Sequence, residues 1–460
     1  MKPSTNGTSR KILQLALPNI ITNITVPLLG MVDTAIVGHL SATHIGAIAI
    51  GTQIFNLIYW NFGFLRMGTS GFTAQAYGAR RLDEAVRVFI RAFTIALAIA
   101  LALLVLQHPL ALLSKLIFNG SSQVLALAFS YFYIRIWAAP ATLGLYAIKG
   151  WFIGMQNSRL PMWIAIFINI VNIVCSLLFV LVFHWDIRGV ALGTVIAQYS
   201  GLLAGLYFVA FRYGKLFRRR LTAEFVRQTL RWSEMRRFFR VNGDIFLRTV
   251  CLAAVFTFIT SESGRISDQI LAVDALLLQF FTLFSYIMDG FAYAGESLVG
   301  RYIGARDRRT LVTTVRSLIV WGLALTLLFT AIYAAFGEPI LRIFSDQESV
   351  IAATRPYLFW VLIIPVCGFS AFLFDGIFVG ATASRTMRNT MFIATAAFFA
   401  VYYGLRQLPL SAGNDADYVH NNTLWVAFMV YLAARGIGQA LMLRTAVYEK
   451  ADAFVKPQDE

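Results

Sequence analysis

Long hydrophobic runs, separated by short polar segments, cover almost the whole chain. A run of about 20 apolar residues lets an α-helix cross the hydrocarbon core of a bilayer, whereas the strands of a membrane barrel alternate over about ten residues. The pattern therefore predicts an all-α polytopic membrane protein with twelve transmembrane helices. The runs lie near residues 12–38, 45–74, 86–108, 122–153, 160–184, 187–211, 240–261, 268–298, 312–336, 347–380, 386–407 and 421–445.

The composition of the 460-residue chain supports a membrane protein and excludes several other classes. Hydrophobic residues make up 58% of the chain and charged residues only 13%, whereas about 25% of a typical soluble domain is charged. So few charges cannot cover a water-exposed surface, which argues against a soluble enzyme. The three cysteines lie inside apolar runs and show neither a disulfide framework nor metal-ligand spacing. We expect neither a metal nor a cofactor.

The net charge of +16 follows the loops of the predicted membrane protein. Lys and Arg gather in alternate loops, most densely over residues 212–240, while the intervening loops are poor in them and carry Asp and Glu. This is the positive-inside pattern of a protein whose two termini both lie in the cytoplasm. It predicts a multi-pass protein of the plasma membrane, which we interpret as a bacterial inner membrane, and it argues against nucleic acid as a partner.

Two halves of the chain match each other at a constant offset of 226 residues. Six helices in each half is an even number, so the halves enter the membrane in the same direction and form a parallel repeat, as in some secondary transporters. We expect an N-lobe over residues 1–211 with helices 1–6, a basic cytoplasmic linker over 212–240, and a C-lobe over 241–460 with helices 7–12. Two such pseudo-symmetric bundles can rock about a central cleft and expose it to each side of the membrane in turn. The matches pair Ala49, Gln53, Phe55, Leu57, Gly78, Ala79 and Arg80 with Ala275, Gln279, Phe281, Leu283, Gly304, Ala305 and Arg306, and Tyr131, Gly150, Phe152, Gly154, Ser158 and Arg159 with Tyr357, Gly376, Phe378, Gly380, Ser384 and Arg385.

Charged groups inside membrane spans are energetically costly, which makes them candidates for function. Asp33 lies in the first hydrophobic run, together with Pro18 and Pro27. Removal from water penalises the ionised form of a carboxyl group, and protonation removes that penalty. Each proline lacks a backbone donor and can bend the helix. We therefore predict that Asp33 couples proton binding to bending of the first helix; the alternative is a carboxylate that snorkels to the outer surface.

The fifth hydrophobic run carries Asn169, Asn172 and Ser176, whose spacings of three and four residues place them on one helix face. We predict that this polar stripe joins the proton-coupling site. The same groups would serve equally well as hydrogen-bonding contacts between helices.

The second half contributes candidate contacts for substrate or ion. Four residues of the eighth run lie three, four and three positions apart, so they form one polar stripe: Tyr286, Asp289, Tyr293 and Glu296. We expect Asp289, Tyr293 and Glu296 to face the cleft. For Glu296 the alternative is an ion pair with Arg301.

Further ionisable residues lie inside apolar runs of both halves. Asp375 aligns with Lys149 under the repeat, so one position carries opposite charges in the two halves, and a salt bridge between them would form a gate. Arg248 lies one turn after Asp244 in the seventh run, where the two would either pair within the helix or contribute to the cleft. A glutamine that recurs in both halves is also included. The predicted cleft residues are thus Asp289, Tyr293, Glu296, Asp375, Arg248, Lys149, Gln53 and Gln279.

As a set, these motifs resemble the multidrug and toxic compound extrusion (MATE) transporters, specifically their DNA-damage-inducible F (DinF) branch. The resemblance covers essentially the whole chain. It rests on residues 32–40 (VDTAIVGHL), 68–72 (GTSGF) and 75–79 (QAYGA) in the first half, and on 289–292 (DGFA), 295–300 (GESLVG), 375–376 (DG) and 379–381 (VGA) in the second.

The resemblance implies twelve helices in two six-helix lobes that form a V, and a cation-coupled antiporter that expels organic, often cationic, compounds. In relatives of this kind the acid at the position of Asp33 is the proposed proton site, and the asparagine at the position of Asn172 belongs to the same cluster. Some relatives carry an Asp where this chain has Ser176, so Asp33 would act without a second carboxylate. Sodium-coupled relatives carry a Glu near the position of Arg248, and the cation here favours protons as the coupling ion.

The sequence therefore predicts a secondary active transporter, a monomer in the lipid bilayer, that exports small organic, amphiphilic compounds in exchange for protons. One alternative is a flippase for lipid-linked or anionic amphiphilic substrates, which the cations Arg66, Arg135, Lys149 and Arg248 would suit. A sodium-coupled antiporter is another. The repeat and the acids inside spans argue against a non-transporting receptor or scaffold. An enzyme is not expected, because no nucleophile–base pair is evident.

Overall fold

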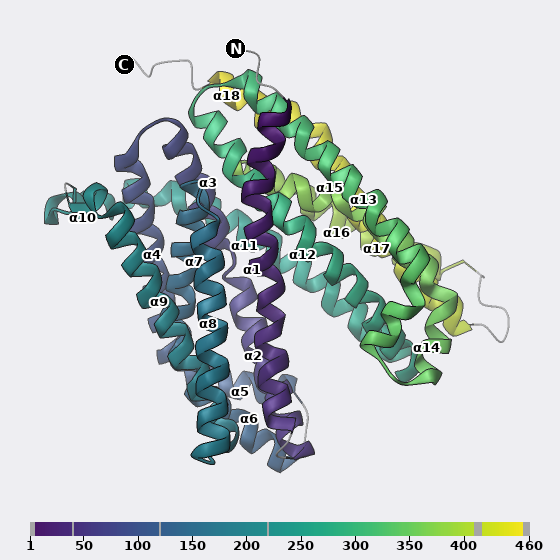
Figure 1. The fold of residues 1–460 in the computed structure, drawn as a ribbon. Helices are drawn as coiled ribbons and strands as arrows, with labels where there is room; N and C mark the ends of the chain where they lie inside the picture. The colour runs from purple at the N-terminus through teal and green to yellow at the C-terminus, as the bar shows by residue number, and fades with distance from the viewer. Residues whose placement is uncertain (1–4, 39–40, 119–120, 219, 409–415, 454–460) are drawn as a thin grey trace. The chain divides into compact units, whose positions relative to one another are not determined.

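The computed structural model describes residues 5–38, 41–118, 121–218, 220–408 and 416–453, and within them all regular structure is helical (Figure 1). The first half contains α1 (Thr5–Gly38), α2 (Ala42–Asn61), α3 (Phe64–Gly78), α4 (Leu82–Val105), α5 (Gln107–Ile117), α6 (Ser122–Arg135), α7 (Ala139–Gly154), α8 (Arg159–Leu177), α9 (Asp186–Arg218) and α10 (Ala223–Thr229). The second contains α11 (Trp232–Ile266), α12 (Asp268–Gly304), α13 (Arg308–Phe344), α14 (Glu348–Thr354), α15 (Leu358–Gly380), α16 (Ser384–Arg406), α17 (Ala416–Leu443) and α18 (Glu449–Ala453). Short 3-10 or π segments are η1 (Ile136–Ala138), η2 (Leu178–Val182), η3 (Arg355–Tyr357) and η4 (Arg444–Tyr448).

The helices have the length and composition of membrane spans. Eleven helical segments among the described residues are long and apolar enough to cross a bilayer, several of them built from two consecutive helices, such as α2 with α3. The remaining predicted span corresponds to α16, 23 residues long, which carries Arg385, Arg388 and Arg406 near its ends. The prediction of an all-α polytopic membrane protein is confirmed.

Large apolar side chains on the outside of the helices fit this environment. Ile343 is 79% exposed, Phe211 78% and Leu441 75%. In water such surfaces would be unfavourable, because each side chain gains about 1.5–3 kcal/mol from burial. In a bilayer the acyl chains cover them.

The chain divides into two compact units. We call residues 17–242 the N-unit, and the described parts of residues 1–16 and 243–460 the C-unit. The basic stretch predicted as a linker, 212–240, groups with the N-unit, and the first part of α1 groups with the C-unit. The lobe boundaries predicted from the sequence stay a prediction.

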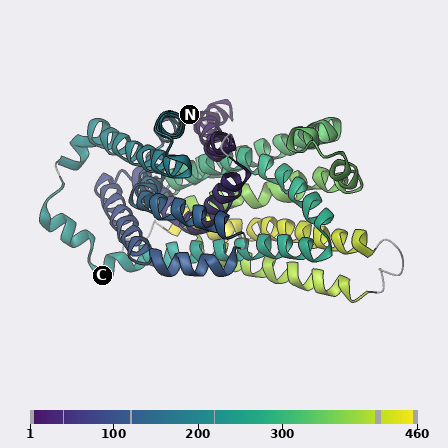
Figure 2. The ribbon, with the colours of Figure 1, turned by 90° about the horizontal axis from the view of Figure 1, so that it is seen from below.

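One buried arginine attaches the basic stretch to the N-unit. The Arg91 side chain on α4 is 6% exposed; it donates to the carbonyl oxygen of Thr229 and forms ion pairs with Glu84 and Glu234. Hydrogen bonds to charged groups stabilise by about 1.5–3 kcal/mol each. Short α10, coloured teal, nevertheless lies at the margin of the ribbon (Figure 2).

The 226-residue repeat recurs as one packing device inside each unit. In the N-unit α3 packs on α7, and a Cβ atom added to Gly150 would lie 2.4 Å from the carbonyl oxygen of Arg66. In the C-unit α12 packs on α15, and a Cβ atom on Gly376 would lie 2.1 Å from the carbonyl oxygen of Ala292. Both members of each contact are related by the same offset, so two glycines solve the same helix crossing twice.

The turn that follows each crossing repeats as well. Gln156 and Thr382 both adopt left-handed backbone conformations, with φ of 63° and 49°. Arg80 and Arg306, also 226 residues apart, both have φ of 57°. Non-glycine residues rarely adopt this conformation, so its recurrence at equivalent positions indicates that the two units share backbone geometry as well as sequence.

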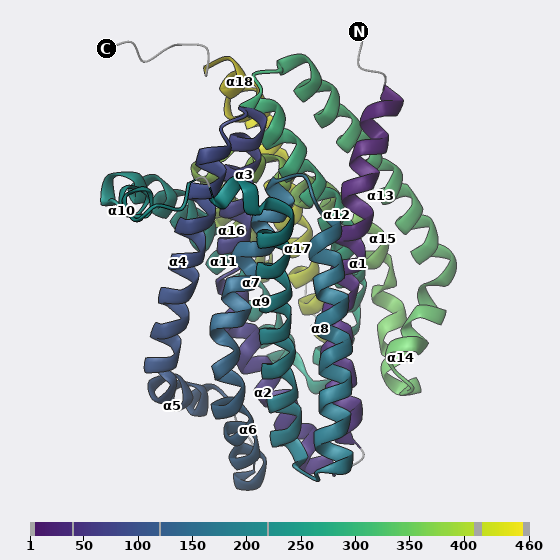
Figure 3. The same cartoon turned by 60° about the vertical axis from the view of Figure 1, so that its left-hand side comes forward.

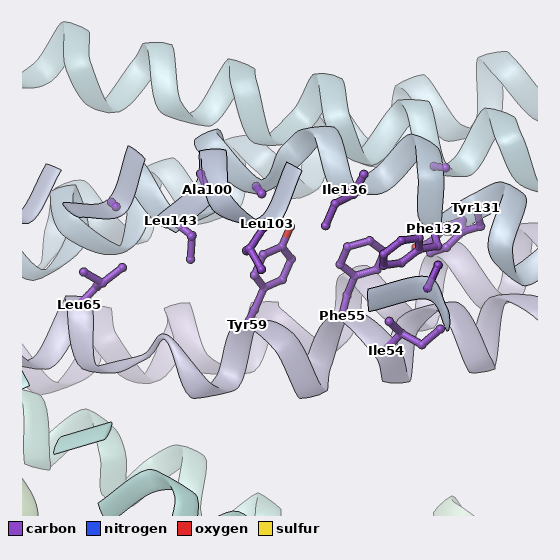
Figure 4. Close-up of a cluster of buried hydrophobic side chains, with 14 of the residues drawn as sticks. Ile54, Phe55, Tyr59, Leu65, Ala100, Leu103, Tyr131, Phe132, Ile136 and Leu143 are labelled. Carbon is purple, nitrogen blue, oxygen red and sulfur yellow. The ribbon is translucent and has the colours of Figure 1, made fainter. Parts of the chain in front are cut away.

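Aromatic rings fill part of the N-unit core between α2 and α6. The ring of Phe55 stacks on Phe132 with centroids 5.4 Å apart and on Tyr59 at 5.6 Å. On the α8 side of this unit α8 runs beside α9 (Figure 3). The close-up in Figure 4 shows the aromatic side chains gathered with aliphatic ones such as Leu103 and Ile136.

Candidate functional site

Asp33 lies in a buried pocket of polar groups inside the N-unit. Its residue surface is 3% exposed, so the alternative of a carboxylate snorkelling to the surface is wrong. The hydroxyl groups of Ser176 on α8 and Thr194 on α9 each lie 3.5 Å from one of its carboxylate oxygens. Among the described residues no Lys, Arg or His forms an ion pair with it. The carboxyl group is thus withdrawn from water and only loosely held.

The polar stripe of α8 faces this region. Asn172 is fully buried and donates to Thr194 Oγ1 at 3.1 Å, while its own Oδ1 has no hydrogen-bond partner. Asn169 donates to the backbone carbonyl of Thr25 on α1 at 2.9 Å. A side chain at Gly193 would bring its Cβ within 2.7 Å of Ser176 Oγ, so a glycine there lets α9 approach α8. The structure therefore brings Asp33 together with Asn172 and Ser176, and places Asn169 on α1 beyond them.

A cation occupies the adjacent aromatic core. Arg135 on α6 donates to the phenol of Tyr131 at 2.6 Å and lies over the ring of Phe55, 4.7 Å from its centroid. Its charge acts electrostatically on Asp33. Sequence reasoning missed Thr194, a lone threonine in an apolar helix with no distinguishing spacing, and it could not connect Arg135 to the acid.

The helix that carries Asp33 contains several features that weaken a regular helix. Pro18 and Pro27 lie inside α1, which continues through both. Three threonine hydroxyls bond back to carbonyls three or four residues earlier, as in Thr34 to Gly30, an arrangement that often bends helices. A Cβ atom at Gly30 would meet nothing within 4 Å. The segment between Pro27 and Asp33 is therefore poorly supported by neighbours and intrinsically easy to bend.

The C-unit contains a second buried polar cluster, centred on Asp375 of α15. One of its oxygens accepts hydrogen bonds from Arg248 of α11 and from Arg435 of α17, the latter at 2.7 Å, and the other accepts from Gln439 at 2.8 Å. Nε of both arginines and Oε1 of Gln439 have no partner. Two guanidinium groups face one carboxylate, so the cluster carries one net positive charge.

Two pairings predicted from the sequence are wrong. Asp244 does not pair with Arg248 along the helix; it accepts from Arg388 at 2.6 Å and from Ser384 at 2.8 Å, both at α16. Asp375 does not form a gate with Lys149, because its ionic partners are arginines of its own unit. Guanidinium groups from neighbouring helices reach these carboxylates, which local spacing could not reveal.

The remaining predicted cleft residues are dispersed over the two units. Glu296 is 1% exposed, whereas Asp289 and Tyr293 on the same helix are half-buried. Lys149 is half-buried on α7. Gln53 and Gln279 are both exposed.

The sequence also contained signals that were not used. Arg435 and Gln439 lie four residues apart in an apolar run, which is the same reasoning that singled out α8. Asp274 is 1% exposed and accepts hydrogen bonds from α11 and α17, although its position near the start of a run suggested a rim residue.

Two repeated helical units with buried ionisable clusters inside membrane spans define a secondary transporter. The MatE family model matches residues 18–178 and 245–403, once in each half. DNA damage-inducible protein F of Escherichia coli (strain K12) is 36% identical over 440 residues, which are 95% of this chain and 92% of that protein. The chain belongs to the MatE family, a family of multidrug and toxic compound efflux transporters, and it is similar to the DinF branch.

Solved structures agree with this assignment at the level of the fold. A structure titled "Crystal structure of MATE in the bent conformation" is 17% identical, with a TM-score of 0.81 over 98% of this chain and 100% of that one. The outward-facing conformation of a multidrug resistance MATE family transporter gives a TM-score of 0.79 at 17% identity and covers 97% of each chain. These relatives are membrane transporters, not enzymes.

Proposed function

We propose that this protein is a proton-coupled antiporter that exports small organic, often cationic, compounds by alternating access. Relatives named as multidrug resistance proteins support the substrate class: MdtK of Edwardsiella ictaluri (strain 93-146) is 22% identical over 95% of this chain and 95% of its own length. The observation that carries the choice of ion is Asp33, a buried carboxyl group with hydroxyl neighbours and no ion pair among the described residues.

The proposed cycle uses the chemistry of this carboxyl group. A proton from outside binds the Asp33 carboxylate and removes the penalty of a charge held out of water. The neutral group then accepts or donates within the hydroxyl and amide cluster, which favours a different bend in the segment from Pro27 to Asp33. Substrate leaves outward, the protein turns inward, and release of the proton to the cytoplasm restores the charge. We place the protein in a bacterial inner membrane as a monomer with both termini cytoplasmic.

Proteoliposomes test the proposal directly. Export of a fluorescent organic cation such as ethidium is measured under an imposed pH gradient and, separately, under a sodium gradient at fixed pH. We expect the pH gradient alone to drive transport, Asp33→Asn to abolish the gradient-driven component, and the exposed-loop control Asp346→Asn to behave as wild type. Undiminished gradient-driven transport by Asp33→Asn would remove this residue from the mechanism. Sodium dependence at fixed pH would overturn the choice of ion.

A second candidate function rests on the Asp375 cluster. Because two guanidinium groups face one carboxylate there, an anionic amphiphile would find a net positive site, as a flippase for lipid-linked substrates requires. Inhibition of ethidium export by an anionic lipid, and not by a zwitterionic lipid of the same chain length, would favour this alternative.

A further inference from the structure

A second buried carboxyl group lies in the C-unit, apart from the Asp375 cluster. Asp274 is six residues after the start of α12 and 1% exposed. Its Oδ2 contacts the hydroxyl of Ser263 on α11, and its Oδ1 accepts from Asn421 Nδ2 at 3.0 Å and from Trp425 Nε1 at 2.7 Å, both on α17. The side chain thus joins three membrane helices.

Every donor to this carboxyl group is neutral: a hydroxyl, an amide and an indole. Among the described residues no cation forms an ion pair with Asp274. The titratable and charged groups on the surrounding elements are Glu262 and Arg265 on α11, Asp268 on α12, Glu348, Arg355 and Tyr357 on α14 and η3, Tyr402 and Arg406 on α16, and Asp417, Tyr418 and His420 on α17. The nearest of these along α11, Glu262, is itself engaged by Tyr402, Arg265 and Arg406.

Counting hydrogens supports a neutral carboxyl group. Ser263 has a single hydroxyl hydrogen, and its Oγ lies 2.8 Å from the carbonyl oxygen of Ile259 as well as against Asp274 Oδ2. If Asp274 carries a proton on Oδ2, it donates to Ser263, and Ser263 donates to Ile259, so each hydrogen has one acceptor. An ionised Asp274 would leave an uncompensated charge in the protein interior, which is strongly unfavourable.

Asn421 gives an independent indication that the cluster changes its hydrogen bonding. It is fully buried, and its Oδ1 has no partner while its Nδ2 donates to Asp274. A buried acceptor without a donor is costly. The site therefore holds one acceptor that a proton-bearing group, such as a water entering on ionisation of Asp274, would satisfy.

We propose that Asp274 is a second proton-binding site of this transporter, located in the C-unit and separate from Asp33. The proposal rests on the proposed proton coupling and extends it to a stoichiometry of two protons in each cycle. In the predicted topology α12 begins at the outer surface, so this carboxyl group takes its proton from outside. The neutral form holds α11, α12 and α17 together; release of the proton leaves a carboxylate that requires water, and hence separation of these helices at this end.

The test combines transport with infrared spectroscopy on the full-length protein in liposomes. Asp274→Asn keeps the shape and the acceptor of the neutral acid and cannot release a proton, so we expect it to fold. The measured proton-to-substrate ratio is expected to fall from two to one. The pH-difference infrared spectrum is expected to lose one carboxylic C=O band, and Asp33→Asn should lose a different one. Asp346→Asn, an exposed carboxyl group, serves as the control.

The outcomes separate the two proposals. If the wild type shows no pH-driven export, the proposed function fails. If export is proton-driven but Asp274→Asn keeps the wild-type ratio and the full set of carboxylic bands, the C-unit site fails. Should Asp274→Asn not fold, Trp425→Phe removes one donor to the same carboxyl group and is expected to shift the pH midpoint of its band; an unchanged midpoint overturns the proposal.

Discussion

The paired glycines at the helix crossings make a quantitative prediction about stability. Alanine at Gly376 would place a methyl group 2.1 Å from the Ala292 carbonyl oxygen, whereas close contacts between carbon and oxygen are about 3.3 Å. Helices α12 and α15 must therefore separate locally by about 1.2 Å. The obstacle is backbone, which cannot rotate away as a side chain can. Overpacking of this kind costs about 1–3 kcal/mol, even after part of it is offset by the helix propensity of alanine.

The repeat supplies both a replicate and controls. Gly150→Ala meets the Arg66 carbonyl oxygen at 2.4 Å in the N-unit and is expected to destabilise by a similar amount. Gly404 on α16 and Gly214 on α9 have nothing within 4 Å of an added Cβ, so alanine there should be neutral or stabilising. The assay is thermal unfolding in detergent at one heating rate, with the purified full chain. If Gly376→Ala unfolds at the same temperature as Gly404→Ala, the argument from helix packing is refuted.

Two further predictions concern the ionisable clusters and the first helix. Asp375→Asn leaves two buried guanidinium groups without a carboxylate and is expected to destabilise the protein by about 3–5 kcal/mol; adding Arg248→Met should recover part of the lost thermal stability, and no recovery would contradict the charge balance. Gly30→Ala fills open space and stabilises the helix by about 1 kcal/mol, so we expect unchanged or higher thermal stability with slower proton-driven export. Export at the wild-type rate would show that bending at this position has no part in the cycle.

Local pattern was sufficient for the class of protein and for part of the N-unit site. The hydrophobic runs predict the spans because a bilayer imposes a length on every helix. The 226-residue offset predicts equivalent helix crossings, since Gly150 and Gly376 are preserved where two backbones meet. The stripe of Asn172 and Ser176 depends only on helix periodicity, and it does face Asp33.

The partners of the buried charges could be decided only by the tertiary structure. Spacing suggested that Asp244 pairs with Arg248, four residues away, yet each binds a residue more than 120 positions distant. Asp274 had the sequence position of a rim residue, and packing of α11 and α17 around it made it the most enclosed acid of its unit together with Glu296. Periodicity fixes which side chains share a face of one helix; which neighbouring helix that face meets, and which charges are thereby removed from water, is a property of the packed bundle alone.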